Sequence, residues 1–169
     1  MVAKSSGEKP RTLDRIDLNI LRVLQRNGRI SYTDLADQVG LSTTPCMERV
    51  KRLEKQGVIE GYYARLSPSH LGYSMLVFVE IALSYQSPDA FERFNEAVAD
   101  LPYVLECHLV SGDADYLLKA RIADMSEYRE LLGEMLLTLP GVKNSKSYIV
   151  MEEVKESLSL PVNPGRSRR

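Results

Sequence analysis

The stretch GLSTTPCMERVKRLEKQGVIEGYY, residues 40–63, decides how the first third of the chain folds. Pro45 fits the first turn of a helix, where the N–H group that proline lacks has no partner, and Gly57 ends that helix. Apolar residues between them recur at i, i+4 and i+7, the spacing of one buried helix face. These residues are Cys46, Val50 and Leu53. The stretch therefore predicts a helix with a buried side and a charged side.

Two shorter helices are expected before this one, each with an apolar face. Their apolar positions are Ile16, Ile20, Val23 and Leu24, then Leu35, Ala36 and Val39. We expect Gly28 to close the first helix at the C′ position, Ser31 and Asp34 to open the second as a capping box, and Gly40 to end it. VIEGYYARL (58–66) follows as short extended structure. Three helices and a two-stranded ribbon predict a winged helix-turn-helix.

The second half of the chain alternates strands and helices. Expected strands are 75–83, 104–111, 116–122 and 146–154, and helices begin at Ser87-Pro88 and at Asp124. The order βαββαβ predicts a ferredoxin-like antiparallel sheet with both helices on one face. The fold class is therefore α+β.

Composition and turn residues divide the chain into five segments. They are a flexible arm at 1–12, a helix-turn-helix domain at 13–66, a linker at 67–73, a ferredoxin-like domain at 74–156 and a flexible tail at 157–169. The linker, SPSHLGY, combines Pro, Gly and Ser, which is typical of a joint between domains.

Charge is distributed unevenly between these domains. Residues 1–66 contain 12 Lys/Arg and 8 Asp/Glu, a net charge of +4, whereas residues 67–160 contain 7 and 15, a net charge of −8. A basic N-terminal part and an acidic C-terminal part indicate that only the first module binds a polyanion. The overall composition is globular. Neither a transmembrane run nor the apolar core of a signal peptide is found, so we expect a cytosolic protein without a membrane partner.

The charged side of the helix in residues 40–57 suits DNA. Small Ala36 and a glycine turn at Gly40 are typical of a helix-turn-helix, and 100° per residue turns the charged positions outward. Hydroxyl and free N–H groups at the helix start suit phosphates, while Lys, Arg and Glu can read base edges. A solvated surface helix is the alternative, which the turn spacing and charge asymmetry disfavour. The predicted DNA-binding residues are Ser42, Thr43, Thr44, Met47, Glu48, Lys51 and Arg52.

Catalytic and metal chemistry find little support in the sequence. Cys46 and Cys107 are far apart, without CxxC or Cys/His spacing, and are expected to be packed thiols. His108 follows Cys107 in a strand, so the two side chains point to opposite faces. Since there is also no Gly-rich phosphate loop, we expect no enzyme, cofactor or metal site.

The open face of the sheet predicts self-association. Strand 75–83 is apolar at nearly every position, so its open face would expose a large patch. A second copy is the simplest cover for that patch, and a dimer also places two reading helices in successive major grooves.

Five segments together resemble the feast/famine (Lrp/AsnC) family of transcriptional regulators. They are LDRIDLNILRVLQRNGRIS, GLSTTPCMERVKRLEKQGVIEGYYARL, LVFVEI, ECHLVSGDADYLLKARI and YIVMEEVKESLSLP, within about residues 13–160. The resemblance implies a cytoplasmic, nucleoid-associated bacterial regulator of amino-acid metabolism that binds double-stranded DNA as a homodimer assembling to an octamer. The leucine-responsive and alanine-catabolism branches both stay open.

The resemblance further implies an amino-acid pocket between neighbouring dimers, made by the turn at 111–115 and the last strand. The implied effector-binding residues are Gly112, Asp113, Asp115, Met125, Tyr148, Ile149 and Val150. A plain hairpin is the alternative for the turn, yet it can offer a carboxylate to an ammonium group and N–H groups to a carboxylate. We expect the Asp115 carboxylate at the mouth of the hairpin. Similar proteins commonly have an aromatic residue at the position of Ala114, which bears on whether the effector is leucine or alanine.

Three functions are therefore compared. The first is a sequence-specific regulator of amino-acid metabolism that responds to a small amino acid such as leucine or alanine. The second is an architectural DNA-binding protein whose second domain only oligomerises. The third is an enzyme that uses Asp113, Asp115 or His108, which no nucleophile–base pairing in the sequence supports.

Overall fold

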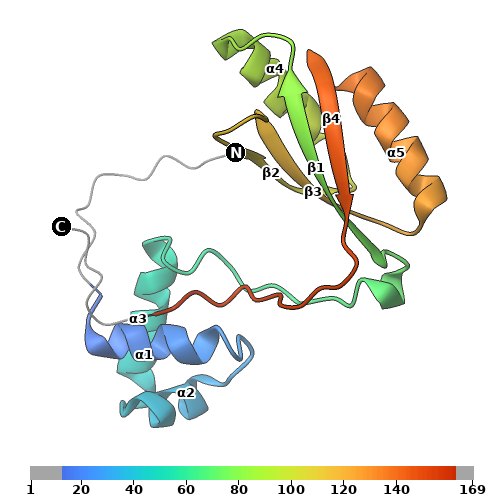
Figure 1. Ribbon diagram of the computed structural model, residues 1–169. Helices are drawn as coiled ribbons and strands as arrows, with labels where there is room; N and C mark the ends of the chain where they lie inside the picture. Colours follow the sequence, from blue (N-terminus) through green and yellow to red (C-terminus); the bar gives the residue numbers. More distant parts are fainter. Residues whose placement is uncertain (1–12, 163–169) are drawn as a thin grey trace. The chain divides into compact units, whose positions relative to one another are not determined.

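The computed structural model describes residues 13–162, and its contacts divide them into two units (Figure 1). The first unit comprises the residues up to Arg65 together with those from Glu156 onward, and the second is Leu66–Lys155. The predicted arm at 1–12, and residues 163–169 of the predicted tail, lie outside the described residues.

Three helices form the first unit: α1 (Arg15–Leu24), α2 (Tyr32–Val39) and α3 (Thr43–Lys55). Their apolar faces meet in one core, as the spacing predicted. The buried residues are Ile20, Leu35, Ala36, Val39, Cys46, Val50 and Leu53. Ser31 caps α2 by accepting a hydrogen bond from the Asp34 N–H. Gly40 ends α2 with φ = 72°, a backbone conformation that glycine adopts without a Cβ clash.

Two expectations for this unit were wrong. Helix α1 ends at Leu24, and Gly28 is not among the residues with positive φ, so it is not a C′ glycine. A Cβ on Gly28 would lie 3.1 Å from Cδ1 of Tyr62, so glycine leaves room there for the tyrosine ring. The two-stranded ribbon is also missing, because residues 58–66 are assigned no strand.

The end of the described chain packs on the first helix, where a flexible tail was expected. We call residues 156–162 the return segment (Figure 1). Gln25 pairs with the backbone of Leu160, donating to its carbonyl at 3.2 Å and accepting from its N–H at 2.6 Å. Arg22 donates two hydrogen bonds, of 3.0 and 2.8 Å, to the carbonyl of Val162. The helix-turn-helix unit is thus built from both ends of the described residues, 13–65 and 156–162.

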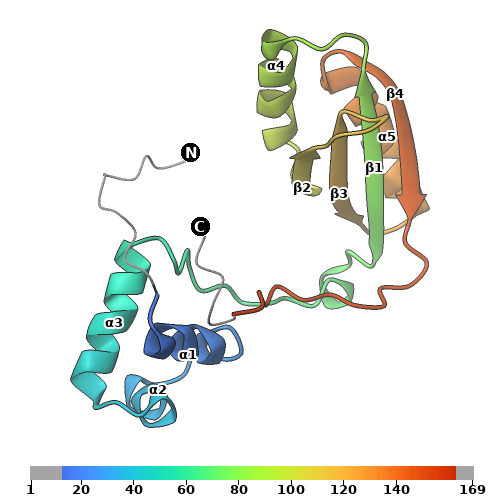
Figure 2. The same cartoon turned by 60° about the vertical axis from the view of Figure 1, so that its left-hand side comes forward.

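The second unit is a four-stranded antiparallel sheet with a short 3₁₀ turn, η1 (Ser69–Leu71), ahead of it. Its elements are β1 (Met75–Leu83), α4 (Pro88–Ala99), β2 (Val104–Leu109), β3 (Tyr116–Ile122), α5 (Met125–Thr138) and β4 (Val142–Ile149). The strand order β2-β3-β1-β4 is that of the predicted ferredoxin-like fold. Figures 1 and 2 show both long helices covering the same face of the sheet.

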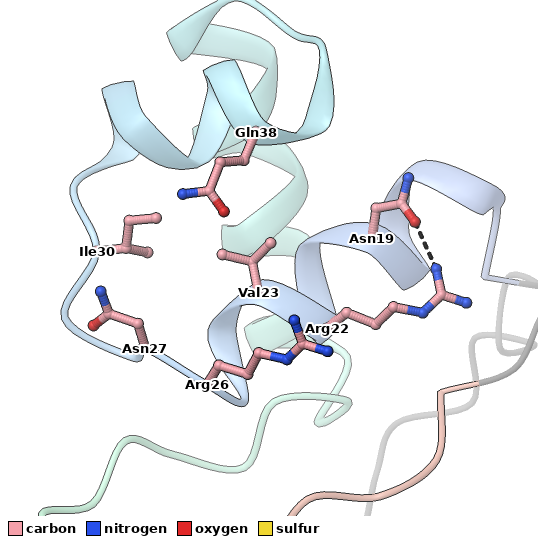
Figure 3. Close-up of a pocket in the computed structure, with 7 residues that line it drawn as sticks. All are labelled: Asn19, Arg22, Val23, Arg26, Asn27, Ile30 and Gln38. Atoms are coloured by element: carbon pink, nitrogen blue, oxygen red, sulfur yellow. Dashed lines mark hydrogen bonds between the residues drawn. The ribbon is translucent and has the colours of Figure 1, made fainter.

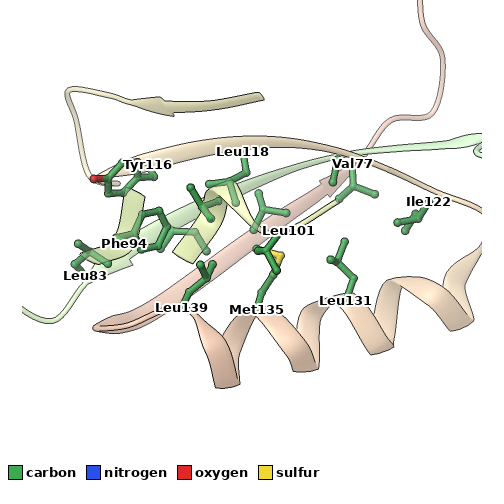
Figure 4. Close-up of a cluster of buried hydrophobic side chains, with 14 residues drawn as sticks. Val77, Leu83, Phe94, Leu101, Tyr116, Leu118, Ile122, Leu131, Met135 and Leu139 are labelled. Atoms are coloured by element: carbon green, nitrogen blue, oxygen red, sulfur yellow. The ribbon is translucent and has the colours of Figure 1, made fainter. Parts of the chain in front are cut away.

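The core of this unit lies between the sheet and its two helices (Figure 4). Alternate residues of β1 and β3 enter it, because side chains alternate across a strand. Tyr116 stacks on Phe94 with ring centroids 4.2 Å apart, and its hydroxyl donates a hydrogen bond of 2.9 Å to Asn95. The hairpin end of β3 is therefore fixed to α4.

The last strand is displaced from its predicted place. It spans Val142–Ile149 rather than 146–154, and β2 ends at Leu109 rather than at residue 111. The start of β4 reads VKNS, a polar sequence that pairs with the end of β1 through Asn144 and Val142. Backbone pairing with β1 therefore extends β4 into a segment whose own side chains do not show the apolar and polar alternation typical of a strand.

Candidate nucleic-acid interface and effector region

Helix α3 presents an exposed row opposite its buried face. Thr44, Glu48, Lys51 and Lys55 are exposed, and Met47 is half-buried beside them. Positions three and four apart adjoin on a helix surface, so these side chains form one continuous stripe. The stripe carries hydroxyl, carboxylate and ammonium groups, which suit both phosphates and base edges.

The first turn of α3 is open to a ligand. Ser42 is the N-cap residue, but its side chain makes no capping hydrogen bond, and Thr43 and Thr44 are exposed. The first N–H groups of a helix have no partner within the helix and carry partial positive charge. These hydroxyl and N–H groups are therefore available to a phosphate.

Arg52 departs from its predicted orientation, in which it faced DNA. Its Nη2 donates a hydrogen bond of 2.6 Å to Oδ1 of Asp17 on α1, and 30% of its side chain is exposed. The helical wheel placed its Cα correctly at the edge of the outward face. A long side chain can still turn toward a buried carboxylate on the neighbouring helix, which a wheel does not represent.

Asp14, Asp17 and Arg49 belong to the same network and were missed by sequence reasoning. Asp14 and Asp17 form a reciprocal capping box at the start of α1, and Nη1 of Arg49 contacts Asp14 at 2.5 Å and Asp17 at 2.8 Å. The hydrogen bond from Arg49 holds the pKa of Asp14 below its usual value, and the two aspartates raise the pKa of Arg49. The feature of the sequence that could have revealed this network is a pair of aspartates three residues apart at the start of a helix.

A hollow of about 420 Å³ lies between α1 and α2, and no residue of α3 lines it (Figure 3). Its lining residues are Asn19, Arg22, Val23, Arg26, Asn27, Ile30 and Gln38. Arg22 donates to the side-chain oxygen of Asn19 at 2.6 Å as well as to the return segment. None of these residues was predicted to bind DNA or an effector.

Asp115 does not lie at the mouth of the hairpin, so that expectation was wrong. The residue is 8% exposed, and its carboxylate accepts hydrogen bonds of 2.7 Å from the Leu83 N–H and 2.6 Å from Gln86. A buried carboxylate needs such donors, and here they tie the β2–β3 turn to the end of β1. Asp115 therefore has a structural position that the turn motif alone did not reveal.

The other predicted effector residues separate into two groups within one chain. Gly112 and Asp113 lie in the turn before Tyr116, at the end of the sheet where β3 begins. Met125 follows the far end of β3, and Ile149 pairs with Val77 near that same far end. Tyr148 and Val150 flank Ile149. Seven residues of strand at about 3.4 Å each separate the turn from Met125 by roughly 20 Å, whereas Tyr148 lies level with Lys119, the middle of β3, through their shared partner Phe78.

The open face of the sheet is less apolar than predicted. Its central residues on β1, Leu76 and Phe78, are buried or half-buried, and Glu80 accepts a hydrogen bond of 3.2 Å from the Tyr148 hydroxyl. Charged side chains from the neighbouring strands lie between them: Lys119 contacts Glu106 at 2.9 Å, and Arg121 contacts Glu153 at 2.6 Å. The face is thus a mixed surface, and the expectation of a continuous apolar patch was wrong.

An apolar hollow of about 330 Å³ lies at one end of this unit. Its lining residues are Leu66, Pro68, Leu71, Tyr73, Pro102, Tyr103, Leu105 and Arg121. It contains none of the predicted effector residues, so the structure of one chain does not connect this hollow with the turn at Gly112.

Cys107 and His108 point to opposite faces, as predicted. Cys107 packs against the core, where burial raises the pKa of its thiol, whereas His108 is exposed and lies 3.3 Å from Glu106. The pair therefore lacks the geometry of a nucleophile and its base.

Comparison with known families accounts for both units. Residues 13–60 match the model of a winged helix-turn-helix DNA-binding domain, and residues 76–160 match the Lrp/AsnC ligand binding domain. The chain belongs to the Lrp/AsnC family. It is a DNA-binding transcriptional regulator with an α+β fold, in which a winged helix-turn-helix precedes a ferredoxin-like domain.

Individual Lrp/AsnC relatives are similar along nearly the whole chain. The leucine-responsive regulatory protein of Escherichia coli (strain K12) is 60% identical over 158 residues, which cover 93% of this chain and 96% of that protein. The protein of the same name from Serratia marcescens is 61% identical over 150 residues, covering 89% and 92%. The similarity therefore spans both units.

Solved structures of the family share the fold. A transcriptional regulator from Neisseria meningitidis in complex with L-methionine matches with a TM-score of 0.85 and 38% identity, covering 90% of this chain and 98% of that one. A feast or famine regulatory protein from M. tuberculosis, complexed with L-methionine, matches with a TM-score of 0.79 and 31% identity, covering 88% and 99%.

The described residues contain neither a membrane-spanning helix nor a cluster of metal ligands. No helix between residues 13 and 162 has the length and apolar character needed to cross a bilayer. Within the same residues, His, Cys, Asp and Glu side chains form no group of three that could hold a metal ion.

Proposed function

We propose that the exposed stripe of α3 reads operator DNA. Ser42, Thr43 and Thr44 bind backbone phosphates at the start of the helix, while Met47, Glu48 and Lys51 contact base edges. The observation that carries this assignment is the exposure of the stripe while Cys46, Val50 and Leu53 on the opposite side are buried. Arg52 is left out of the base-reading set because it is held by Asp17.

Lys51→Ala tests this assignment. If Lys51 contacts a base, its loss costs about 1–3 kcal/mol of binding to an operator selected with the wild-type protein, and it relaxes specificity at one position. Lys143→Ala removes an exposed lysine from β4 and is the matched control. Operator affinity that falls equally in both variants would remove Lys51 from the reading face.

We also propose that operator binding responds to a small apolar amino acid held by the sheet unit. Gly112 and Asp113 are exposed in the turn, where a carboxylate and backbone N–H groups suit the two charged ends of an amino acid. Two family members were solved with L-methionine, which supports an effector of this class. Leucine, alanine and methionine are the effectors to test.

The effector site is completed by a second copy of the chain in this proposal. Met125 lies beyond the far end of β3 from the turn, and Tyr148, Ile149 and Val150 lie at the end of β4, across β1 from β3 and level with the middle of β3 or beyond it, so an effector of this size does not reach both groups in one chain. Homodimers that assemble further, to an octamer, would bring the two groups together. An effector bound between copies then shifts the oligomer distribution by linkage.

Calorimetry with the twenty amino acids, joined to light scattering, tests the effector proposal. Asp113→Asn removes the charge expected to meet the ammonium group, and should weaken binding about ten- to a hundredfold. Asp89→Asn on α4 removes an exposed charge elsewhere in the unit and serves as control. Wild-type protein that binds no amino acid would favour the architectural alternative, in which this unit only oligomerises.

The remaining aspects of the proposal follow from the family. A regulator of chromosomal operators acts in the cytoplasm, in association with the nucleoid. We assign it no enzymatic role, since Cys107 and His108 diverge and Asp115 is fully engaged in the structure of the turn.

A further inference from the structure

The carboxylate of Asp17 is the centre of the contact between α1 and α3. Its side chain is 3% exposed. Oδ1 accepts hydrogen bonds from Arg49 at 2.8 Å and from Arg52 at 2.6 Å, and Oδ2 accepts from the Asp14 N–H at 3.1 Å. One buried carboxylate on the first helix thus holds two cations of the reading helix.

This arrangement halves the free positive charge of α3. The helix carries four cations, of which Arg49 and Arg52 are bound to aspartates of α1, whereas Lys51 and Lys55 are exposed and make no ion pair within the described residues. Arg52 lies four residues after exposed Glu48 and three before exposed Lys55. Its Cα therefore belongs to the outward row, and only its guanidinium is turned away.

Arg52 is held incompletely. Only its Nη2 contacts Asp17, so the pair lacks the two parallel hydrogen bonds of a bidentate arginine–carboxylate contact. Its Nε is buried and has no hydrogen-bond partner among residues 13–162. A single hydrogen bond to the charged Asp17 thus holds the guanidinium on the side of α1, although the Cα of Arg52 lies in the outward row.

We infer that Asp17 is a specificity-determining residue, which withholds Arg52 from the DNA backbone. Contacts to phosphates add affinity without distinguishing sequences. Restraining this arginine lowers binding to unrelated DNA and leaves discrimination to the side chains that face the bases. This role goes beyond the proposed set of base and phosphate contacts, because Asp17 touches no DNA itself.

Asp17→Asn, in the full-length protein, tests the inference, because it keeps the shape and an acceptor oxygen but removes the charge. Binding is measured at several salt concentrations to an operator selected with the wild-type protein and to a scrambled duplex of equal length. Because Arg49 stays paired with Asp14, the released Arg52 alone should strengthen binding to the scrambled duplex, about three- to tenfold at low salt. The slope of log K against log salt should steepen by about 0.9 per arginine engaged.

Two controls separate this effect from a change in net charge or in folding. Asp37→Asn removes an exposed charge of α2 that makes no ion pair in the described residues, and should leave the slope unchanged. Asp17→Asn combined with Arg52→Gln should reverse most of the steepening. A folded Asp17→Asn protein with the wild-type slope and specificity, or an equal change in Asp37→Asn, would overturn the inference.

Arg52→Gln alone keeps the inference testable if Asp17→Asn does not fold. Since Arg52 is withheld from DNA in the wild-type protein, this variant should keep the wild-type salt slope. A slope shallower by about 0.9 would place Arg52 on a phosphate in the wild-type complex and would contradict the role assigned to Asp17.

Discussion

The backbone N–H of Leu83 donates a hydrogen bond of 2.7 Å to the buried carboxylate of Asp115, which joins the end of β1 to the turn that precedes β3. Asp115→Ala leaves that N–H without its partner. The free energy of unfolding should fall by about 1–3 kcal/mol, measured by urea denaturation. The exposed neighbour Asp113→Ala should stay within about 0.5 kcal/mol of wild type. Equal losses in the two variants would contradict a structural role for Asp115.

The buried face of α3 makes a second prediction, which separates folding from DNA contact. Val50→Ala removes two methyl groups from a site that is 1% exposed, and should lower the free energy of unfolding by about 2 kcal/mol. Lys51→Ala, one residue further along, should leave it within about 0.5 kcal/mol. Thermal or urea unfolding of both variants checks this, and a stable Val50→Ala protein would place the core elsewhere.

Tyr62 should titrate at unusually high pH. Partial burial, followed by its hydrogen bond of 2.9 Å to Glu54, raises the pKa of the phenol to about 12. Because the folded pKa lies above the unfolded value of about 10, the stabilisation is complete below pH 10 and is lost as the pH rises toward 12. The ultraviolet difference between wild type and Tyr62→Phe should show this midpoint. A difference centred near pH 10 would mean that neither burial nor the hydrogen bond to Glu54 acts on the phenol.

The return segment allows a test with two truncations. A chain that ends after Glu156 loses four hydrogen bonds to Arg22 and Gln25, and should lower the stability of the helix-turn-helix unit by about 1–3 kcal/mol. A chain that ends after Val162 keeps those bonds and is the control. Hydrogen exchange of α1 measures the effect locally, and identical protection in the two chains would show that the segment adds nothing.

Helix packing and strand order were predictable because buried apolar residues recur at regular intervals along the sequence. Cys46, Val50 and Leu53 pack as their spacing predicted, and β1 and β3 have the expected bounds. The hydrogen-bond partners of polar side chains do not follow from any such regular spacing. The positions of Arg52 and Asp115 are set by partners 35 and 32 residues away. A local pattern fixes the direction of a Cα–Cβ bond, but a distant partner decides where a long side chain ends.

The candidate effector residues likewise show that a local sequence pattern does not predict which distant residues lie together. The turn at Gly112 and the strand at Tyr148 are both recognisable as segments, but their separation depends on how β3, β1 and β4 are registered. Register follows from the ladder as a whole. The residue pattern therefore indicated which residues are candidates, and only the family resemblance implied that neighbouring dimers bring them together.

The hydrogen bonds from Arg22 to Val162 also set an order of events during synthesis. These residues are 140 positions apart, so at about 5–20 residues per second the ribosome makes the partner of Arg22 roughly 7–28 s after Arg22 itself. All of the sheet unit is translated in that interval. The first three helices therefore emerge before the DNA-reading unit has all of its hydrogen-bond partners, and the unit is completed only after the sheet unit has been made.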